Sequence, residues 1–129
     1  MTDAERLQAT RIFIAALSQV TPEFTEPIPF DPRTFAEVVA SLQATGNAFA
    51  KRFIVFETVA GKNCPDFQHG MTAAQSAGLI ARQNPTYQYF SVRMAHRTID
   101  DVLKAEAQVS TDASMVARQY CLALGTLQA

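Results

Sequence analysis

The most regular hydrophobic pattern in the chain lies in residues 31–60, where apolar positions recur at alternating spacings of four and three. A repeat of about 3.5 residues is the spacing by which one helix presents a continuous seam to a neighbour. Asp31 as N-cap and Pro32 as the first helical residue indicate where this helix begins. The pattern predicts one long, central second helix. Its seam comprises Phe35, Val39, Leu42, Gly46, Phe49, Phe53, Phe56 and Ala60.

Two segments favour other structures inside this range. Thr45-Gly46-Asn47 contains the residues that commonly follow a helix C-terminus. Residues 52–59 are rich in β-branched and aromatic side chains, which favour a strand. We favour the continuous helix because the seam keeps its phase through both segments, and we expect Gly46 to mark a close approach of another backbone. Apolar side chains off the seam indicate that residues 49–60 are central or covered by another chain; they are Ile54, Val55 and Val59.

Residues before this segment divide into a helix and an extended connection. The pair Thr2 and Glu5 forms a capping box that predicts an amphipathic helix ending near Val20. Four prolines between residues 21 and 33 exclude a helix there. The apolar residues between these prolines predict a strap docked on the helices; they are Phe24, Ile28 and Phe30.

Residues after this segment predict a loop and three further helices. The loop covers residues 61–71, and the helices cover 72–83, 85–108 and 112–124, with Gly125 ending the last. Residues 87–94 are also compatible with a strand. We therefore predict an all-α fold: a single compact domain, residues 1–129, of about five helices in a helical bundle. The alternative is an α+β fold with short paired strands near 52–59 and 87–94.

Composition excludes several classes of function. The formal net charge of −1 provides no general attraction for nucleic acid or an acidic membrane surface. No uncharged run approaches the length of a membrane span. The segment Thr2-Asp3-Ala4-Glu5 is acidic where a secretory signal is basic. We expect a cytoplasmic location if Met1 is native, and a periplasmic or secreted one if a signal has been removed.

The candidate chemical groups are few and scattered. Cys64 and His69 share one loop, with Asp66 between them, but no oxyanion donors accompany this possible nucleophile and base. The ligand types Cys64, His69, His96 and Cys121 suit zinc, yet they lack the paired short spacings of structural zinc sites. Cys64 and Cys121 permit a disulfide that a core of this size does not need. The sequence thus predicts no catalytic, cofactor-binding or metal-ligating residue.

A partly basic stripe and a lysine-containing turn are also explained without a ligand. Arg93, Arg97, Asp100 and Lys104 share one face of the predicted fourth helix, where charges of opposite sign alternate at helical spacing. The turn Ala60-Gly61-Lys62-Asn63 lacks the glycine spacing and the hydroxyl residue of a phosphate-binding loop. Neither feature predicts a nucleic-acid or nucleotide site.

The main functional indication is that residues 49–60 carry more apolar surface than the other predicted helices can cover. This favours a non-enzymatic protein–protein interaction protein, a small structural or adaptor subunit that self-associates or joins an assembly. One alternative is an exported or periplasmic inhibitor or immunity-type binder with a Cys64–Cys121 disulfide. A second is a small-ligand or enzyme domain that uses the Cys64–His69 loop. The interface candidates are Phe49, Phe53, Ile54, Val55, Phe56, Val59, Tyr87, Tyr89 and Phe90.

Overall fold

A computed structural model of the chain describes residues 1–21, 27–82 and 88–125. Helices dominate the fold, as predicted, but short antiparallel strands accompany them, so the α+β alternative is nearer to the observed class than the all-α prediction. The elements are α1 (Asp3–Val20), β1 (Ile28–Pro29), α2 (Pro32–Ala44), the 3-10 helix η1 (Ala50–Arg52), β2 (Phe56–Thr58), β3 (Gly61–Asn63), α3 (Pro65–Ser76), β4 (Ile80–Arg82), β5 (Tyr89–Val92), α4 (His96–Ala105) and α5 (Ala107–Leu124).

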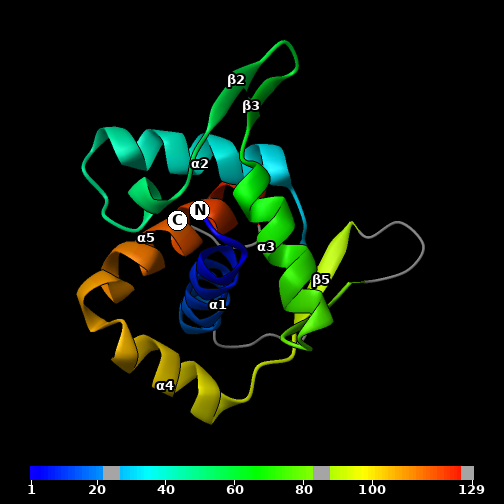
Figure 1. Ribbon diagram of the computed structural model, residues 1–129, viewed down its shortest axis with the longest axis vertical. Coiled ribbons are helices and arrows are strands. Elements are labelled where there is room, and N and C mark those ends of the chain that lie inside the picture. Colours follow the sequence, from blue (N-terminus) through cyan, green and yellow to red (C-terminus); the bar gives the residue numbers. More distant parts are fainter. Residues whose placement is uncertain (22–26, 83–87, 126–129) are drawn as a thin grey trace.

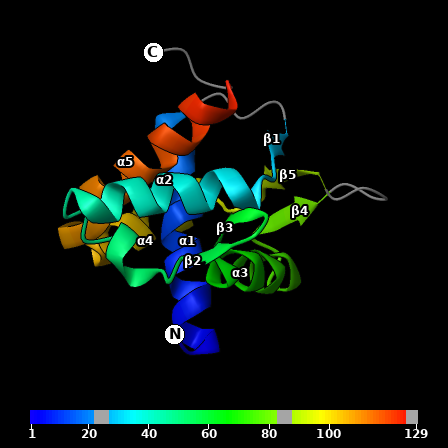
Figure 2. The same cartoon turned by 90° about the horizontal axis from the view of Figure 1, so that it is seen from above.

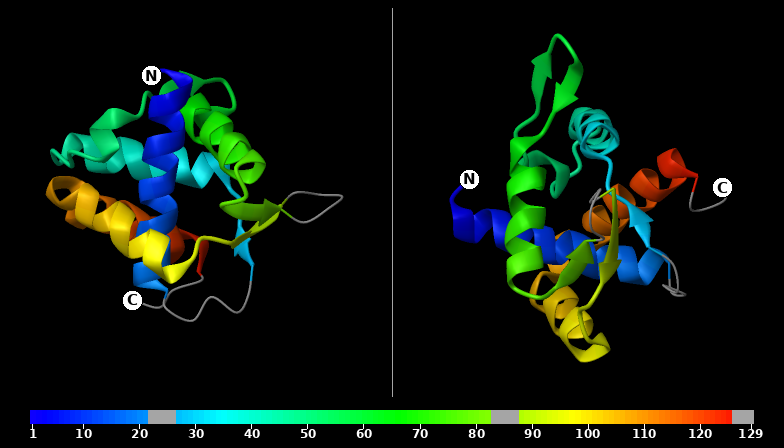
Figure 3. Two further views of the ribbon diagram at one scale, coloured as in Figure 1. Left: turned by 60° about the horizontal axis from the view of Figure 1, so that its bottom comes forward. Right: turned by 90° about the vertical axis from the view of Figure 1, so that its right-hand side faces the viewer.

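The central helix is α1, not the second helix. It packs against α3, α4 and α5, and these helices surround it in Figures 1 and 3. Every residue from 12 to 17 is buried, because the helix is apolar on all sides there. The predicted capping box is confirmed. The Thr2 hydroxyl accepts from the Glu5 N–H at 3.1 Å, and the Glu5 carboxylate accepts from the Thr2 N–H at 3.0 Å.

The predicted long helix is wrong beyond Ala44, where α2 ends. Gly46 has a φ of +88°, a conformation that glycine adopts without steric cost. The Gly46 N–H donates to the Gln43 carbonyl and the Asn47 N–H to the Leu42 carbonyl, each at 3.1 Å. These two bonds form the Schellman motif that closes a helix C-terminus. A Cβ at Gly46 would meet open space, so the expected close approach is not at this residue.

The close approach of two helices lies instead at Gly70 of α3. A Cβ added there would overlap the Thr10 hydroxyl oxygen on α1 and lie 3.1 Å from the Arg6 carbonyl oxygen. Thr10 is almost wholly buried and its hydroxyl donates to that same carbonyl at 2.8 Å. A side chain at position 70 would therefore push α3 away from α1.

Asn47 connects the end of α2 to the start of α5. Its side chain is buried; the amide nitrogen donates to the Asp112 carbonyl at 3.1 Å, and the amide oxygen accepts from the Ala50 N–H at 2.8 Å. The Asp112 carboxylate in turn accepts from the Ala48 N–H at 2.9 Å. Buried polar groups in this turn thus have partners from the same small network.

Replacement of Asn47 by alanine is expected to lower the free energy of unfolding by about 1–3 kcal/mol, because it leaves the buried Ala50 N–H without its partner and removes one donor to the Asp112 carbonyl. Chemical denaturation of the purified variant measures this loss. Asn63→Ala is the matched control, since the half-buried Asn63 side chain makes no hydrogen bond within the described residues. A loss below about 1 kcal/mol for Asn47→Ala would show that these bonds do not hold the turn.

The strands form two separate antiparallel sheets. In the first, β5 lies between β1 and β4, with Ile28 opposite Phe90 and Ile80 opposite Val92. In the second, β2 pairs only with β3, and the two-residue tip Val59-Ala60 joins them. The predicted strands near 52–59 and 87–94 correspond to β2 and β5, but these two do not pair with each other.

The later helices differ from the predicted ranges. The helix expected at 72–83 begins earlier, because Pro65 occupies the first turn of α3. The helix expected at 85–108 is replaced by β5 and the shorter α4, and the last helix begins at Ala107. Gly125 follows α5 with a φ of +76°, as the predicted terminator. Among the described residues, no helix has both the length and the apolar character needed to cross a membrane.

The connection between α1 and α2 is docked on the core over its described part, residues 27–31. Ile28 is buried, and the Phe30 ring stacks on Phe67 with a centroid distance of 5.4 Å. The buried Tyr120 hydroxyl donates to the Pro29 carbonyl at 2.7 Å and accepts from the Asp31 N–H at 3.0 Å. Phe24, also predicted to dock, lies outside the described residues. The strap prediction is therefore confirmed for Ile28 and Phe30.

Candidate functional site

Residues 54–63 form an arm that projects from the helical body. It consists of Ile54 and Val55, which connect η1 to β2 outside any helix or strand, and the hairpin β2–β3, which extends beyond the helices in Figure 1 and in the right view of Figure 3. All three residues of β2 are exposed. Ile54 is 51%, Phe56 53% and Val59, at the tip, 110% exposed relative to the same residue in a fully accessible chain. The arm therefore carries large apolar groups into solvent.

The base of the arm is fixed to α2. Phe49 and Phe53 flank η1, are buried, and contact each other edge to face with ring centroids 5.4 Å apart. The Gln43 amide on α2 donates to the Ala50 carbonyl at 3.0 Å and to the Phe53 carbonyl at 2.7 Å. Phe53 also packs edge-on against Phe35 of α2 at 5.2 Å. These contacts hold Phe53, which directly precedes Ile54, in the core.

A buried carboxylate fixes the same base to α3 and α1. Asp66, in the first turn of α3, is 5% exposed. Its carboxylate accepts from the Arg6 Nε at 2.9 Å and from the Ile54 backbone N–H at 3.3 Å. Arg6 also pairs with the exposed Asp3 at 2.8 Å. A buried charge is tolerated when it is paired and hydrogen-bonded, as Asp66 is. Its position indicates a structural role at the start of the arm.

The two strands of the arm separate apolar from charged side chains. In the register, Phe56 lies opposite Asn63 and Thr58 opposite Gly61, on one face. Glu57 and Lys62 lie opposite each other on the other face, and their side chains form an ion pair. The Thr58 hydroxyl donates to the Gly61 carbonyl at 2.7 Å. The arm is thus locally neutral, and its exposed apolar residues are not mixed with unpaired charge.

Other interface candidates are divided between the core and the surface. Phe49, Phe53 and Phe90 are buried within this chain and offer no surface to a partner. Val55 is partly buried, and Tyr89, on β5, is 43% exposed. Tyr87 lies outside the described residues. The candidates that remain available for contact are Ile54, Val55, Phe56, Val59 and Tyr89.

The thiol and imidazole of the expected loop lie on a helix and not in a loop. Cys64 is the N-cap of α3, and its side chain is fully buried. Burial raises the pKa of the Cys64 thiol to about 11, so the thiolate needed for nucleophilic attack is disfavoured at neutral pH. His69 is exposed and lies five residues further on, about 140° around the helix. The geometry does not join these groups as nucleophile and base.

Neither a disulfide nor a ligand cluster unites the remaining candidates. Cys64 and Cys121 are both buried thiols, so the disulfide considered for an exported protein does not form in this structure. Within the described ranges, histidine, cysteine and acidic side chains do not gather in a group able to hold a metal ion. On the expected basic face, Arg93 precedes α4, whereas Arg97, Asp100 and Lys104 are exposed on it.

Comparison with protein-family models, curated proteins and solved structures finds no match to this chain. The candidate site therefore depends on its own geometry.

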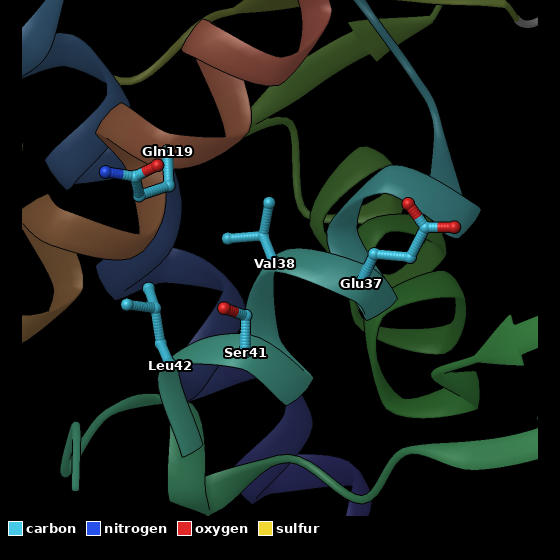
Figure 4. A pocket seen from close by; sticks show the side chains of 5 residues that line it. All are labelled: Glu37, Val38, Ser41, Leu42 and Gln119. Atoms are coloured by element: carbon cyan, nitrogen blue, oxygen red, sulfur yellow. The ribbon is translucent and has the colours of Figure 1, made fainter. Parts of the chain in front are cut away.

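A shallow groove between α2 and α5 is the second surface feature of interest. Its volume is about 380 Å³, and Figure 4 shows Val38 and Leu42 on α2 facing it, with Gln119 on α5 across from them. Glu37 and Ser41 complete its lining. The groove is open, and no charged or polar group in its lining is buried. It has less apolar exposure than the arm, which we therefore treat as the candidate site.

Sequence reasoning missed the residues that hold the arm in place. Gln43, Asn47 and Asp66 are polar residues whose partners lie in other elements, and their hydrogen bonds have no periodic signature. Asn47 had a local signal, because it follows Gly46 at a helix end. The missed signal at Asp66 is its position just after Pro65 in the first turn of α3, where a carboxylate is favoured by the helix dipole.

Proposed function

We propose that this protein is a non-enzymatic protein–protein interaction protein, a small structural or adaptor subunit, and that the arm of residues 54–63 is its contact surface. One observation carries the proposal. Of the five large hydrophobic residues that are exposed in the described part of the chain, Ile54, Phe56 and Val59 belong to the arm. Tyr89 and Met115 lie on β5 and α5. Clustered exposed apolar side chains usually mark a contact site.

The way in which the arm is held supports the proposal. Gln43 and Asp66 fix its base through backbone hydrogen bonds to Phe53 and Ile54. A surface that is positioned before binding loses less conformational freedom when a partner binds. The fold therefore presents the apolar residues of the arm in a defined orientation.

The exposed positions also have no role in the core that requires apolar residues. Val59 is wholly in solvent, and about half of the Ile54 and Phe56 surface is accessible. Polar residues there would leave the aromatic core around Phe35 unchanged. Contact with another polypeptide explains the apolar side chains at these positions.

A variant that removes the apolar groups of the arm tests this function. Ile54→Ser/Phe56→Ser/Val59→Ser is expected to keep its fold and to weaken association at least about ten-fold, since truncation of central apolar contacts commonly costs over 1 kcal/mol each. Sedimentation velocity measures self-association from micromolar to millimolar concentration. Quantified capture of proteins from the source organism by immobilised wild type and variant measures association with other partners.

Tyr89→Ser/Met115→Ser is the control, because it removes two similarly exposed apolar side chains outside the arm. It is expected to bind as the wild type does. Equal binding by the arm variant and the wild type would refute the arm as the contact surface. A wild-type protein that associates neither with itself nor with a captured protein would refute the interaction function.

A further inference from the structure

We infer that the partner of the arm is a second copy of this chain, bound by antiparallel pairing of the outer edge of β2 with the same edge of that copy. The inference rests on the proposed function of the arm. It specifies a hydrogen-bonding partner and a register, and both follow from the arrangement of residues 54–63.

The edge of β2 that faces away from β3 is open. The second sheet contains β2 and β3 alone among the described residues, and β3 is the strand that packs on α2. On that side the Arg33 side chain approaches Gly61, since a Cβ at Gly61 would lie 3.2 Å from the Arg33 Nε. An isolated two-stranded hairpin is marginally stable in water, whereas pairing two hairpins makes a four-stranded sheet. An open strand edge is a template for this pairing.

The direction of each backbone amide can be assigned from Asp66. The Ile54 N–H donates to the Asp66 carboxylate, on the side where β3 leads into α3. Successive amides of an extended strand point in opposite directions within the sheet. Phe56 and Thr58 therefore direct their amides toward β3. The hairpin agrees, because the two residues that flank a two-residue loop, here Thr58 and Gly61, bond to each other, and the direction alternates from Thr58 back to Phe56. Val55 and Glu57 direct theirs to the outer edge, where a second strand can bond to them.

Only one antiparallel register uses both outward residues without conflict. Pairing centred on Glu57 sets two carboxylates directly opposite each other, which is destabilising. Pairing centred on Val55 requires Phe53 as a partner for Glu57, but Phe53 is buried at the base of the arm. Pairing centred on Phe56 sets Val55 opposite Glu57 in both directions. That register is symmetric about a two-fold axis, as a dimer of identical chains requires.

The same register also sorts the side chains by polarity. Phe56 lies opposite its counterpart in the second copy, and Ile54 lies opposite Thr58, so the apolar groups of both copies form one continuous strip on one face. Glu57 faces Val55 across the new junction and keeps its ion pair with Lys62 within each copy. The charge pattern is therefore compatible with a second copy of the arm.

A disulfide between copies tests the register. In this register, Phe56→Cys places the two new thiols directly opposite each other, in a pair that is not hydrogen-bonded. The Cα atoms of such a pair lie about 4.5 Å apart, within the range that a disulfide spans. Under mild oxidation we expect most of this variant to become a covalent dimer. The native Cys64 and Cys121 are buried and do not compete. Val59→Cys is the control: its counterpart would lie about 20 Å away, six residues along the strand, and no bridge is expected.

Equal cross-linking of Val59→Cys and Phe56→Cys, or no cross-linking of Phe56→Cys, would overturn the register. Sedimentation of Phe56→Lys and Val59→Lys tests the contact without oxidation. Phe56→Lys sets like charges opposite each other and is expected to weaken dimerisation about ten-fold or more, whereas Val59→Lys, beyond the paired segment, is expected to have little effect. A wild type that stays monomeric at millimolar concentration while its arm captures another protein would overturn this inference and leave the proposed function intact.

Discussion

Replacing Phe35 by alanine is expected to lower the free energy of unfolding by about 3–5 kcal/mol, whereas Phe56→Ala is expected to change it by less than about 0.5 kcal/mol. The Phe35 ring is fully buried and stacks on Phe67 with a centroid distance of 3.9 Å and an interplanar angle of 12°. It also contacts Phe13 edge to face at 5.1 Å. Phe56 is 53% exposed and lies outside this cluster.

Denaturant unfolding at low micromolar protein measures both values without a contribution from association of the arm. The pair is a matched test because the same atoms are removed from two phenylalanines that share the predicted seam. Similar losses for the two variants would mean that both side chains are buried in one packed seam, as a continuous second helix would require. A large loss for Phe35→Ala alone supports the division of that seam between core and arm.

Gly70→Ala is expected to destabilise the protein by about 2–3 kcal/mol, although alanine normally stabilises an exposed helix by about 1 kcal/mol relative to glycine. The sign reverses because the added methyl group overlaps the Thr10 hydroxyl, which is held by its bond to the Arg6 carbonyl. Figure 2 shows α3 beside α1, the right view of Figure 3 shows the two helices crossing, and they are in contact. Thermal or chemical unfolding measures the loss.

The double variant Thr10→Ala/Gly70→Ala separates a steric cause from a conformational one. Removing the hydroxyl opens space for the new methyl group, so the double variant is expected to lose less stability than the sum of its single variants. Gly46→Ala is the contrasting case, because its added methyl group meets open space but alanine must adopt a positive φ there. It is expected to lower the free energy of unfolding by about 1 kcal/mol, and Thr10→Ala is not expected to restore this loss. Additive losses at positions 10 and 70 would contradict the close crossing.

The error in the predicted second helix has a specific cause. Periodicity counts apolar positions without regard to the elements that carry them, so it linked Phe35 on α2, Phe49 and Phe53 beside η1, and Phe56 on β2. The local signals in the same segment were correct. Thr45-Gly46-Asn47 ends the helix through two backbone hydrogen bonds, and the β-branched and aromatic run contains a strand. Phe35, Phe49 and Phe53 do converge in the core after the chain has turned, whereas Phe56 has the same spacing but is exposed on the arm.

The sequence by itself determined the features that are encoded within about four residues. These are the capping box of Thr2 and Glu5, the start of α2 at Asp31 and Pro32, and the end of α5 at Gly125. Each depends on hydrogen bonds or backbone conformations between near neighbours, which residue type alone can indicate. Composition also indicated the surplus of apolar residues between positions 49 and 60.

The tertiary structure alone decided which of those apolar residues enter the core and which remain exposed. Phe53 is buried because its ring packs against Phe35 and its carbonyl accepts a hydrogen bond from Gln43. Ile54, the next residue, is exposed, and its backbone N–H donates to Asp66. Asp66 itself is hydrogen-bonded to Arg6, which lies sixty positions away in the sequence. The Tyr120 hydroxyl donates to the Pro29 carbonyl, which lies ninety-one positions away. Burial depends on such partners from distant segments, and no local pattern specifies them. The position of the arm, and hence the proposed contact surface, follows from this long-range packing.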